Sequence, residues 1–308
     1  MYDKIRKNAF PLLAAAIWGL AFVAQKNNTT GAFTFNMSRS AVAFVFLLII
    51  VPVFTKGDFK HILSEKTSKE TGSLWFGGIL CGIALSAATF LQQLGLDSGT
   101  EAGKASFLTA MYIVIVPVFG IFLKKRVSLT VWAGIALAVV GLYLLCVRED
   151  FTISPSDLLI VACSIIFAAH IMLIDHFSTR CDGMKMSCIQ FLTSAVVSGV
   201  FAFIFENPSW SVISENALTV LYLGVFSSGI AYTLQILAQK NANPALVTLL
   251  LSMESVFGVL FGALFLGESL TAREYLGCVI MLAAVVLAQI PVGEMIKKRK
   301  RRKADEPR

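Results

Sequence analysis

The sequence predicts an all-α membrane protein whose ten transmembrane helices form two inverted repeats of five helices each. Two properties of the composition point to a membrane: the mean hydropathy is +0.76, and only 15% of the 308 residues are charged. The third observation is a series of ten apolar runs. Each is close to the length of about 20 residues that spans a bilayer. A soluble domain of ordinary composition is therefore excluded.

Each apolar run is predicted to form one helix. Their ranges are 9–25, 34–54, 74–95, 103–123, 127–147, 157–174, 186–205, 216–237, 245–266 and 272–291. The first run has a basic start, as a signal peptide does, but no small-residue cleavage site follows it before the polar segment 25–30. We therefore expect the first run to remain as a helix.

The Lys and Arg residues predict the orientation of the helices, because cytoplasmic loops carry an excess of them. With the N-terminus in the cytoplasm, 21 of the 26 Lys and Arg residues fall on the cytoplasmic side and four on the other, while Arg39 lies inside a helix. The outer loops carry acids instead, as at Glu149, Asp150 and Glu206. We expect a multi-pass protein of the cell membrane with both termini in the cytoplasm.

A basic tail, residues 294–308, follows the last apolar run. It holds eight Lys and Arg residues: Lys297, Lys298, Arg299, Lys300, Arg301, Arg302, Lys303 and Arg308. Such a run directly after a membrane helix is typical of contact with anionic lipid headgroups. The bilayer is therefore an expected partner of the tail, and nucleic acid is not.

The cysteine and histidine residues predict neither a metal site nor a cofactor. None of the six cysteines forms a C-x-x-C pair, and most lie within apolar runs, where they act as small packing residues. His61, His170 and His176 are too scattered along the chain to suggest a common metal ion.

The two halves of the chain resemble each other. A shift of 143 residues aligns the third to fifth runs with the eighth to tenth without a gap, and it places Gln92 on Gln235. The chain therefore divides into a first repeat, 1–150, and a second repeat, 151–293. Because five is an odd number, the second repeat starts from the opposite side of the membrane, as in many secondary transporters.

Small residues spaced four apart predict close contacts between helices. The pairs are Gly78/Gly82, Gly224/Ser228 and Gly258/Gly262. Pro117 is predicted to kink the fourth helix, since proline removes a backbone donor.

Two charged residues within the apolar runs are candidate functional residues, because a charge at membrane depth faces protein or water. Arg39 lies about 9 Å into the second helix at 1.5 Å per residue, and Glu254 lies near the middle of the ninth. One interpretation is that they form an ion pair that fixes the packing. The other is that they bind a charged or zwitterionic solute.

Five uncharged residues complete the candidate set. Gln92 and Gln235 occupy equivalent positions near opposite membrane faces, which suits alternating gates, although interhelical hydrogen bonding is the alternative. Trp18 and Tyr112 could line a pocket or simply pack between helices. His170, near the cytoplasmic end of the sixth helix, could relay protons or make a structural hydrogen bond.

Motifs along nearly the whole chain, residues 9–291, share their order and spacing with a known family. They are Ile17–Lys26, Gly103–Tyr112, Pro117, Lys124–Arg126, Trp132, Gly134, Gly141–Leu145, Met253–Ser255, Leu266–Thr271 and Gly277. Together they resemble the EamA-type branch of the drug/metabolite transporter superfamily. The resemblance implies two inverted five-helix halves, a central solute cavity, and export of amino acids or other small metabolites. The family often has Glu-Pro in the ninth helix, whereas here Ser255 follows Glu254.

Three classes of function are compatible with a multi-pass membrane protein. An intramembrane enzyme needs a converging nucleophile and base or paired acids, but H-E-x-x-H, G-x-S-x-G and Walker motifs are absent from the sequence. A sensor or structural protein that uses the basic tail as an electrostatic switch would leave the repeat and the two buried charges unexplained. We therefore predict a secondary active transporter that exports a small-molecule solute by alternating access, and not an enzyme. The sequence leaves open the identity of the solute, export versus uptake, coupling to protons versus exchange or facilitated diffusion, and whether the protein forms a homodimer.

Overall fold

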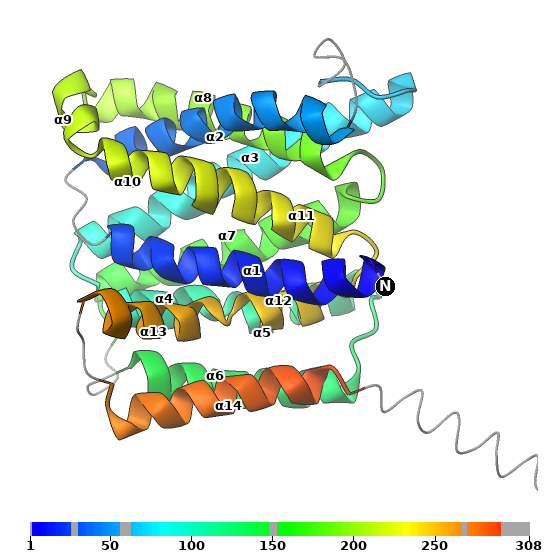
Figure 1. Ribbon diagram of the computed structural model, residues 1–308, viewed down its shortest axis with the longest axis vertical. Helices are drawn as coiled ribbons and strands as arrows, with labels where there is room; N and C mark the ends of the chain where they lie inside the picture. The colour runs from blue at the N-terminus through cyan, green and yellow to red at the C-terminus, as the bar shows by residue number, and fades with distance from the viewer. Residues whose placement is uncertain are drawn as a thin grey trace, which may run out of the picture.

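A computed structural model of the protein describes residues 2–25, 30–55, 63–100, 102–147, 153–266 and 270–290, and all regular elements in these ranges are helices (Figure 1). The first predicted repeat holds α1 (Tyr2–Gln25), α2 (Ala32–Thr55), α3 (Ser68–Asp97), α4 (Ala102–Ala110), α5 (Tyr112–Phe122) and α6 (Leu129–Cys146). The second holds α7 (Pro155–Phe177), α8 (Gly183–Phe205), α9 (Trp210–Glu215), α10 (Ala217–Tyr222), the π-helix η2 (Leu223–Tyr232), α11 (Thr233–Gln239), α12 (Pro244–Leu251), α13 (Glu254–Leu266) and α14 (Ala272–Ala288). The basic tail, 294–308, lies outside the described residues.

Eight stretches of described helix are long and apolar enough to cross a membrane. They are Ala32–Phe54, Ser68–Asp97, Lys104–Phe122, Leu129–Cys146, Pro155–Phe177, Gly183–Phe205, Ala217–Gln239 and Pro244–Phe265. These stretches fall on the second to ninth predicted runs. Helices α1 and α14 fall on the first and tenth. The protein is therefore an all-α membrane protein, and the count of ten spans stays a prediction.

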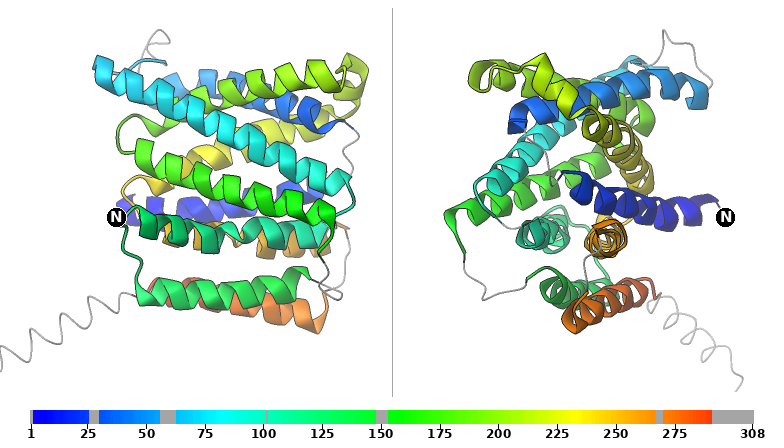
Figure 2. Two further views of the ribbon diagram at one scale, coloured as in Figure 1. Left: turned by 180° about the vertical axis from the view of Figure 1, so that it is seen from behind. Right: turned by 60° about the vertical axis from the view of Figure 1, so that its left-hand side comes forward.

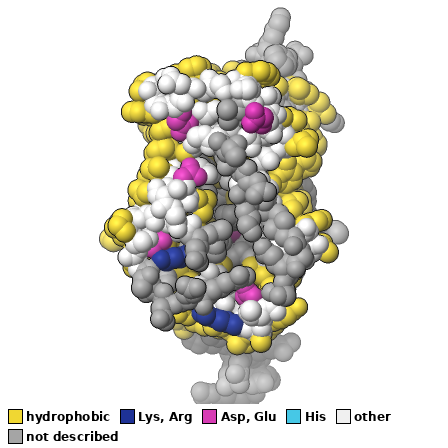
Figure 3. Space-filling view, turned by 90° about the vertical axis from the view of Figure 1, so that its left-hand side faces the viewer, with side chains coloured by type: hydrophobic (Ala, Val, Ile, Leu, Met, Phe, Trp, Pro, Cys, Tyr) yellow, Lys and Arg dark blue, Asp and Glu magenta, His cyan; other side chains and the backbone are white. Residues whose placement is uncertain are grey.

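The helices lie side by side, and their connections gather at two ends of the bundle (Figures 1 and 2). We call the end where α1 begins the basic end; it carries Lys66, Lys125, Arg180, Lys185 and Lys240. The opposite end carries Gly99 and Glu206, and acidic side chains are spread over its surface (Figure 3). The ends thus differ in charge as the orientation argument requires.

Capping side chains fix where four helices start at the basic end. Thr67, Ser128, Asp182 and Asn243 each accept a hydrogen bond from a backbone N–H in the first turn of α3, α6, α8 and α12, respectively. Residues of these types satisfy amide groups that have no partner within the helix, which stabilises a helix by about 1 kcal/mol. The helix starts are therefore encoded locally.

Small residues allow the closest helix contacts, as predicted. A Cβ on Gly82 of α3 would lie 2.5 Å from the carbonyl oxygen of Gln190 in α8. A Cβ on Gly224 of η2 would lie 3.0 Å from the carbonyl oxygen of Arg39 in α2. At both positions a larger residue would force the two helices apart, so the backbones approach only because glycine is present.

Contacts between helices recur between the equivalent helices of the other half, when each of the first five predicted spans is matched with the span five places later. Helix α1 packs on α12 and α13, as α7 packs on α4 and α5. Helix α1 also packs on η2 and α11, as α7 packs on α3. Helix α3 packs on α8, as η2 packs on α2, and the pairs α2 with α8 and α6 with α14 map onto themselves. This recurrence is the arrangement expected of two related halves.

Candidate functional site

Two of the spanning helices are interrupted within their length. Met111 separates α4 from α5, and Ser252 and Met253 separate α12 from α13. At both breaks a methionine N–H donates to the carbonyl three residues earlier, at 3.2 Å for Met111 and 3.3 Å for Met253. The breaks leave Tyr112 as the first residue of α5 and Glu254 as the first residue of α13.

Neither break lies at a proline residue. The structure interrupts the fourth span at Met111, whereas Pro117 lies inside α5. In the ninth span Ser255 replaces the family proline, yet the helix is still interrupted, just before Glu254. A break in this span therefore does not require the proline.

The eighth span has a third irregularity. It passes through the π-helix η2, which bears Ser227, Ser228 and Tyr232. π-Helical segments are rare and occur frequently at functional sites. Within η2, the carbonyl of Ser227 and the ring of Tyr232 contact Trp18 of α1, and Ser228 contacts Arg39 of α2.

A cavity lies among these irregular helices and has an empty volume, open mouth included, of about 600 Å³. Six of the seven sequence-predicted residues line it: Trp18, Arg39, Gln92, Tyr112, Gln235 and Glu254. The structure therefore brings together residues from six different helices that the sequence singled out one by one.

The two charged residues of the cavity have separate partners. Arg39 is 7% exposed, and its Nε donates to Ser228 Oγ at 3.2 Å. The Arg39 guanidinium also lies within electrostatic reach of the Tyr232 hydroxyl. Glu254 is 6% exposed, and its Oε1 accepts a hydrogen bond from the Tyr112 hydroxyl at 3.2 Å. No ion pair joins Arg39 to Glu254, so the packing interpretation of these charges does not hold in this conformation.

Aromatic side chains form one wall of the cavity. The rings of Trp18 and Tyr232 have centroids 4.8 Å apart. Trp18 Nε1 donates to the carbonyl of Ser227 at 3.0 Å, which fixes the indole against η2. A wall of this kind offers apolar surface together with polar edges.

The predicted amide and histidine residues divide between the cavity and its surroundings. Gln92 Nε2 donates to Thr109 Oγ1 at 3.1 Å, and both side chains line the cavity. Gln235 lines it as well. His170 does not: its Nε2 is 2.9 Å from Gln190 Oε1, and its ring lies behind Tyr232, with centroids 6.0 Å apart.

Sequence reasoning missed several residues of the lining. They are Ala21, Gln25, Thr89, Thr109, Phe167, Ile171, Ser227, Tyr232 and Leu251. The repeat contained a signal for two of them, because the shift of 143 residues places Thr89 on Tyr232, one turn before Gln92 and Gln235. The others are ordinary residues of apolar helices, and only the helix packing directs them inward.

The sequence matches the EamA-like transporter family twice, over residues 8–147 and 154–289. The chain belongs to this family. An uncharacterized transporter of Archaeoglobus fulgidus is 30% identical to this EamA-like chain over 289 residues, which are 91% of this chain and 84% of the relative. An uncharacterized inner membrane transporter of Escherichia coli K12, YedA, is 25% identical and covers 70% of this chain and 69% of its own length.

A solved crystal structure resembles the fold of this EamA-like protein with a TM-score of 0.76. It covers 92% of this chain and 96% of its own, at 17% sequence identity, and therefore supports the fold alone. The family and the curated relatives are described as transporters rather than enzymes. The protein is accordingly a membrane transporter.

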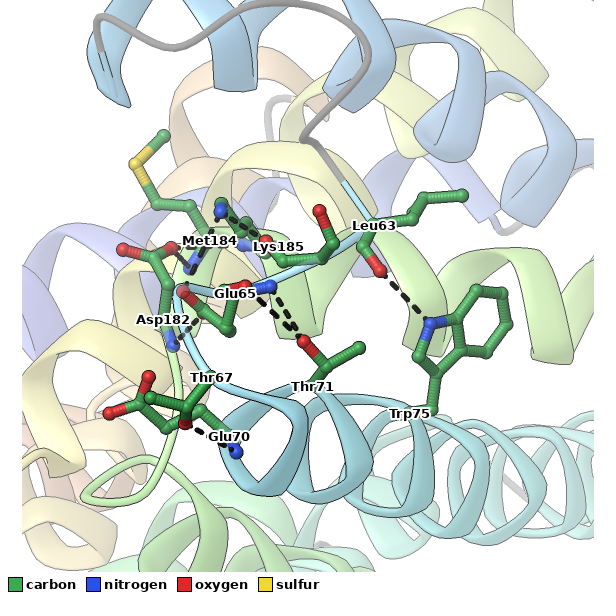
Figure 4. Close-up of polar contacts among 10 residues, drawn as sticks. Leu63, Glu65, Thr67, Glu70, Thr71, Trp75, Asp182, Met184 and Lys185 are labelled. Carbon is green, nitrogen blue, oxygen red and sulfur yellow. Dashed lines mark hydrogen bonds and ion pairs between the residues drawn. The ribbon is translucent and has the colours of Figure 1, made fainter.

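Polar contacts tie the segment before α3 to the start of α8 at the basic end of this transporter (Figure 4). Glu65 Oε1 accepts the backbone N–H of Asp182 at 2.8 Å, and Glu65 Oε2 is 3.6 Å from Lys185 Nζ. Lys185 Nζ also donates to the carbonyl of Ser64 at 2.6 Å. These contacts join the first half of the EamA-like chain to the second.

Glu206 makes the matching contact at the opposite end. Its carboxylate oxygens accept the backbone N–H groups of Phe33, at 2.8 Å, and Thr34, at 2.7 Å, in the first turn of α2. Glu206 follows α8 as Glu65 follows α2. Each carboxylate therefore holds the start of the equivalent helix in the other half. Because both contacts exist in one conformation, the two halves are joined at both ends of the bundle.

We expect Glu65→Ala to lower the Tm of the purified protein, since it leaves the Asp182 N–H and the Lys185 ammonium without their carboxylate. The free energy of unfolding should fall by about 1–2 kcal/mol, a moderate value because the Glu65 contacts are only partly buried. Glu70→Ala is the control, because Glu70 is an exposed acid in the first turn of α3, the helix that follows Glu65. Equal Tm shifts in the two variants would show that the Glu65 contacts do not stabilise the fold.

Proposed function

We propose that this EamA-like protein is a secondary active transporter that exports a small zwitterionic metabolite, such as an amino acid, across the cell membrane by alternating access. The observation that carries the proposal is the placement of Arg39 and Glu254 in one cavity without an ion pair between them. A buried charge is stabilised by an opposite charge. A solute with one carboxylate and one ammonium group would supply a partner to each.

The arrangement of the chain supports alternating access. The two family matches and the recurrence of helix contacts favour two inverted halves, 1–150 and 151–293, with ten spans in total. Helices interrupted directly before Tyr112 and Glu254 support a solute site at the interface of the halves, as in other transporters built from inverted repeats.

The remaining predicted residues take roles that suit this cavity. Trp18 and Tyr112 form walls against the solute, while Gln92 and Gln235 lie toward the opposite end and the basic end, respectively, as gating residues. The excess of Lys and Arg favours a cytoplasmic location for the basic end and both termini, with the tail 294–308 in contact with anionic lipid. Since the sequence contains no ATP-binding motif, transport runs on a gradient or by exchange.

The proposal is tested with the purified full-length protein in proteoliposomes. We expect uptake of radiolabelled L-threonine by exchange to be inhibited by unlabelled L-amino acids. L-Threoninamide, which lacks the carboxylate, and N-acetyl-L-threonine, which lacks the ammonium, should inhibit at least about tenfold more weakly, because each leaves one buried charge unpaired. In Arg39→Gln, L-threoninamide should inhibit almost as well as L-threonine, because the partner of the carboxylate is gone. In Glu254→Gln, N-acetyl-L-threonine should inhibit almost as well as L-threonine, because the partner of the ammonium group is gone. Failure of every L-amino acid to exchange would contradict the proposed solute class.

A further inference from the structure

Four buried polar side chains lie between the cavity and the basic end. We call them the inner polar cluster: His170 on α7, Gln190 on α8, and Gln235 and Gln239 on α11. Each is at most 2% exposed. Helix α11 packs on both α7 and α8, and it reaches the basic end at Gln239 itself.

Direct contacts link the cluster to the cavity. His170 bonds Gln190, and its ring packs edge-on against Tyr232, which lines the cavity. Gln239 Nε2 donates to the carbonyl of Ile171 at 3.0 Å, and Ile171 is also part of the lining. Gln235, one turn before Gln239, belongs to both. The cluster therefore lies directly beside the cavity, on the side toward the basic end, and shares Gln235 with its lining.

Every member of the cluster has a polar atom without a hydrogen-bond partner in the described part of the chain. These atoms are His170 Nδ1, Gln190 Nε2, Gln235 Oε1 and Gln239 Oε1. A buried polar atom left unpaired destabilises a protein by about 1–3 kcal/mol. Such groups are retained where function uses them, and their concentration at the end of a transport cavity points to a ligand.

The chemistry of the free atoms defines that ligand. Gln190 Oε1 accepts from His170 Nε2, so the proton of the neutral ring is on Nε2 and Nδ1 is an acceptor. With the two glutamine oxygens, the cluster offers three acceptors and one amide donor. A carboxylate would face these acceptors unfavourably, whereas a group with O–H or N–H donors would satisfy them.

We propose that the inner polar cluster is a subsite at the side of the cavity toward the basic end, and that it binds an uncharged hydroxyl or amide group of the solute. The proposal rests on the proposed transport function, and it adds a determinant of specificity to it. Arg39 and Glu254 bind the charged groups, and the cluster selects the side chain. The inner polar cluster therefore favours amino acids whose side chains bear a hydroxyl or amide group over apolar amino acids of equal size.

The test compares exchange of L-threonine and L-valine, which differ by a hydroxyl in place of a methyl group. We expect wild type to prefer threonine by about tenfold or more in kcat/KM, since a site that hydrogen-bonds a hydroxyl discriminates against its apolar isostere. In the double variant His170→Leu/Gln190→Met, threonine exchange should fall to the level of valine exchange, while valine exchange is retained. The Tm should not fall, because both partners of the hydrogen bond are replaced by apolar groups.

The matched control is Ser187→Ala/Thr233→Val, which removes a buried polar pair between α8 and α11, with hydroxyl oxygens 2.8 Å apart. The threonine preference should survive in it. If His170→Leu/Gln190→Met still prefers threonine over valine, the proposal is overturned and the cluster holds only water. If this variant loses exchange of both amino acids equally and has a lower Tm, the proposal is also overturned and the cluster is structural. If the wild-type protein exchanges neither threonine nor valine, the proposed solute class is wrong. The subsite can then still be refuted by stability: a Tm of His170→Leu/Gln190→Met below that of Ser187→Ala/Thr233→Val would show that the cluster is structural.

Discussion

Glu254→Gln should abolish most transport while the protein still inserts and folds. The substitution keeps the size of the side chain and an oxygen that can accept from the Tyr112 hydroxyl, now 3.2 Å from Glu254 Oε1. It removes only the charge. Because a hydrogen bond to a charged group contributes about 1.5–3 kcal/mol, loss of the charge should reduce exchange of a zwitterionic solute about 10- to 100-fold. Exchange in proteoliposomes, normalised to the amount of inserted protein, measures this effect.

The control for Glu254→Gln is the same change at Glu274, a buried carboxylate in the first turn of α14 that is not part of the cavity lining. Glu274→Gln should leave the transport rate close to that of wild type. Wild-type exchange in Glu254→Gln would remove the functional role of the carboxylate altogether.

A double variant distinguishes solute binding from packing. If Arg39 and Glu254 neutralised each other, Arg39→Gln combined with Glu254→Gln would restore the expression lost in either single variant. In the structure Arg39 bonds Ser228 and Glu254 bonds Tyr112. We therefore expect no recovery.

The helix positions could be predicted from the sequence because long apolar runs have few alternatives in a bilayer. Helices occupy all ten predicted ranges within the described residues. The internal breaks could not be predicted in the same way. The interruption of the fourth span occurs at Met111 rather than at Pro117, since backbone geometry there depends on the helices that pack around it. The π-helix of the eighth span has no comparable local signal.

The candidate site was predictable where a residue conflicts with its apolar surroundings. Arg39, Glu254, Gln92 and Gln235 are unusual in membrane helices, and all four line the cavity. Phe167 and Leu251 also line it but resemble any other packing residue. His170 shows the limit of residue type as a criterion, because it is polar and buried but lies outside the cavity lining.

The contact between α1 and α13 positions two residues of the cavity at once. Trp18 precedes Gly19 in α1, and Glu254 begins α13. A Cβ on Gly19 would lie 2.6 Å from Phe257 Cβ, 2.7 Å from the backbone nitrogen of Gly258 and 2.9 Å from the carbonyl oxygen of Glu254. Backbone atoms cannot move aside as the end of a side chain can. Any larger residue at position 19 must therefore separate the helices.

We expect Gly19→Ala to lower the Tm of the purified protein, since overpacking of this kind destabilises by about 1–3 kcal/mol. Exchange should fall further than the Tm implies, because separation of α1 from α13 moves Trp18 away from Glu254. Gly258→Ala is the matched control on the other side of the contact. Its Cβ would have Gly19 atoms as nearest neighbours at 3.6 and 3.8 Å, which are ordinary van der Waals distances. Because alanine favours a helix over glycine by about 1 kcal/mol, Gly258→Ala should keep or raise the Tm and retain exchange. Equal effects of the two alanines would mean that the close approach at Gly19 does not set the geometry of the cavity.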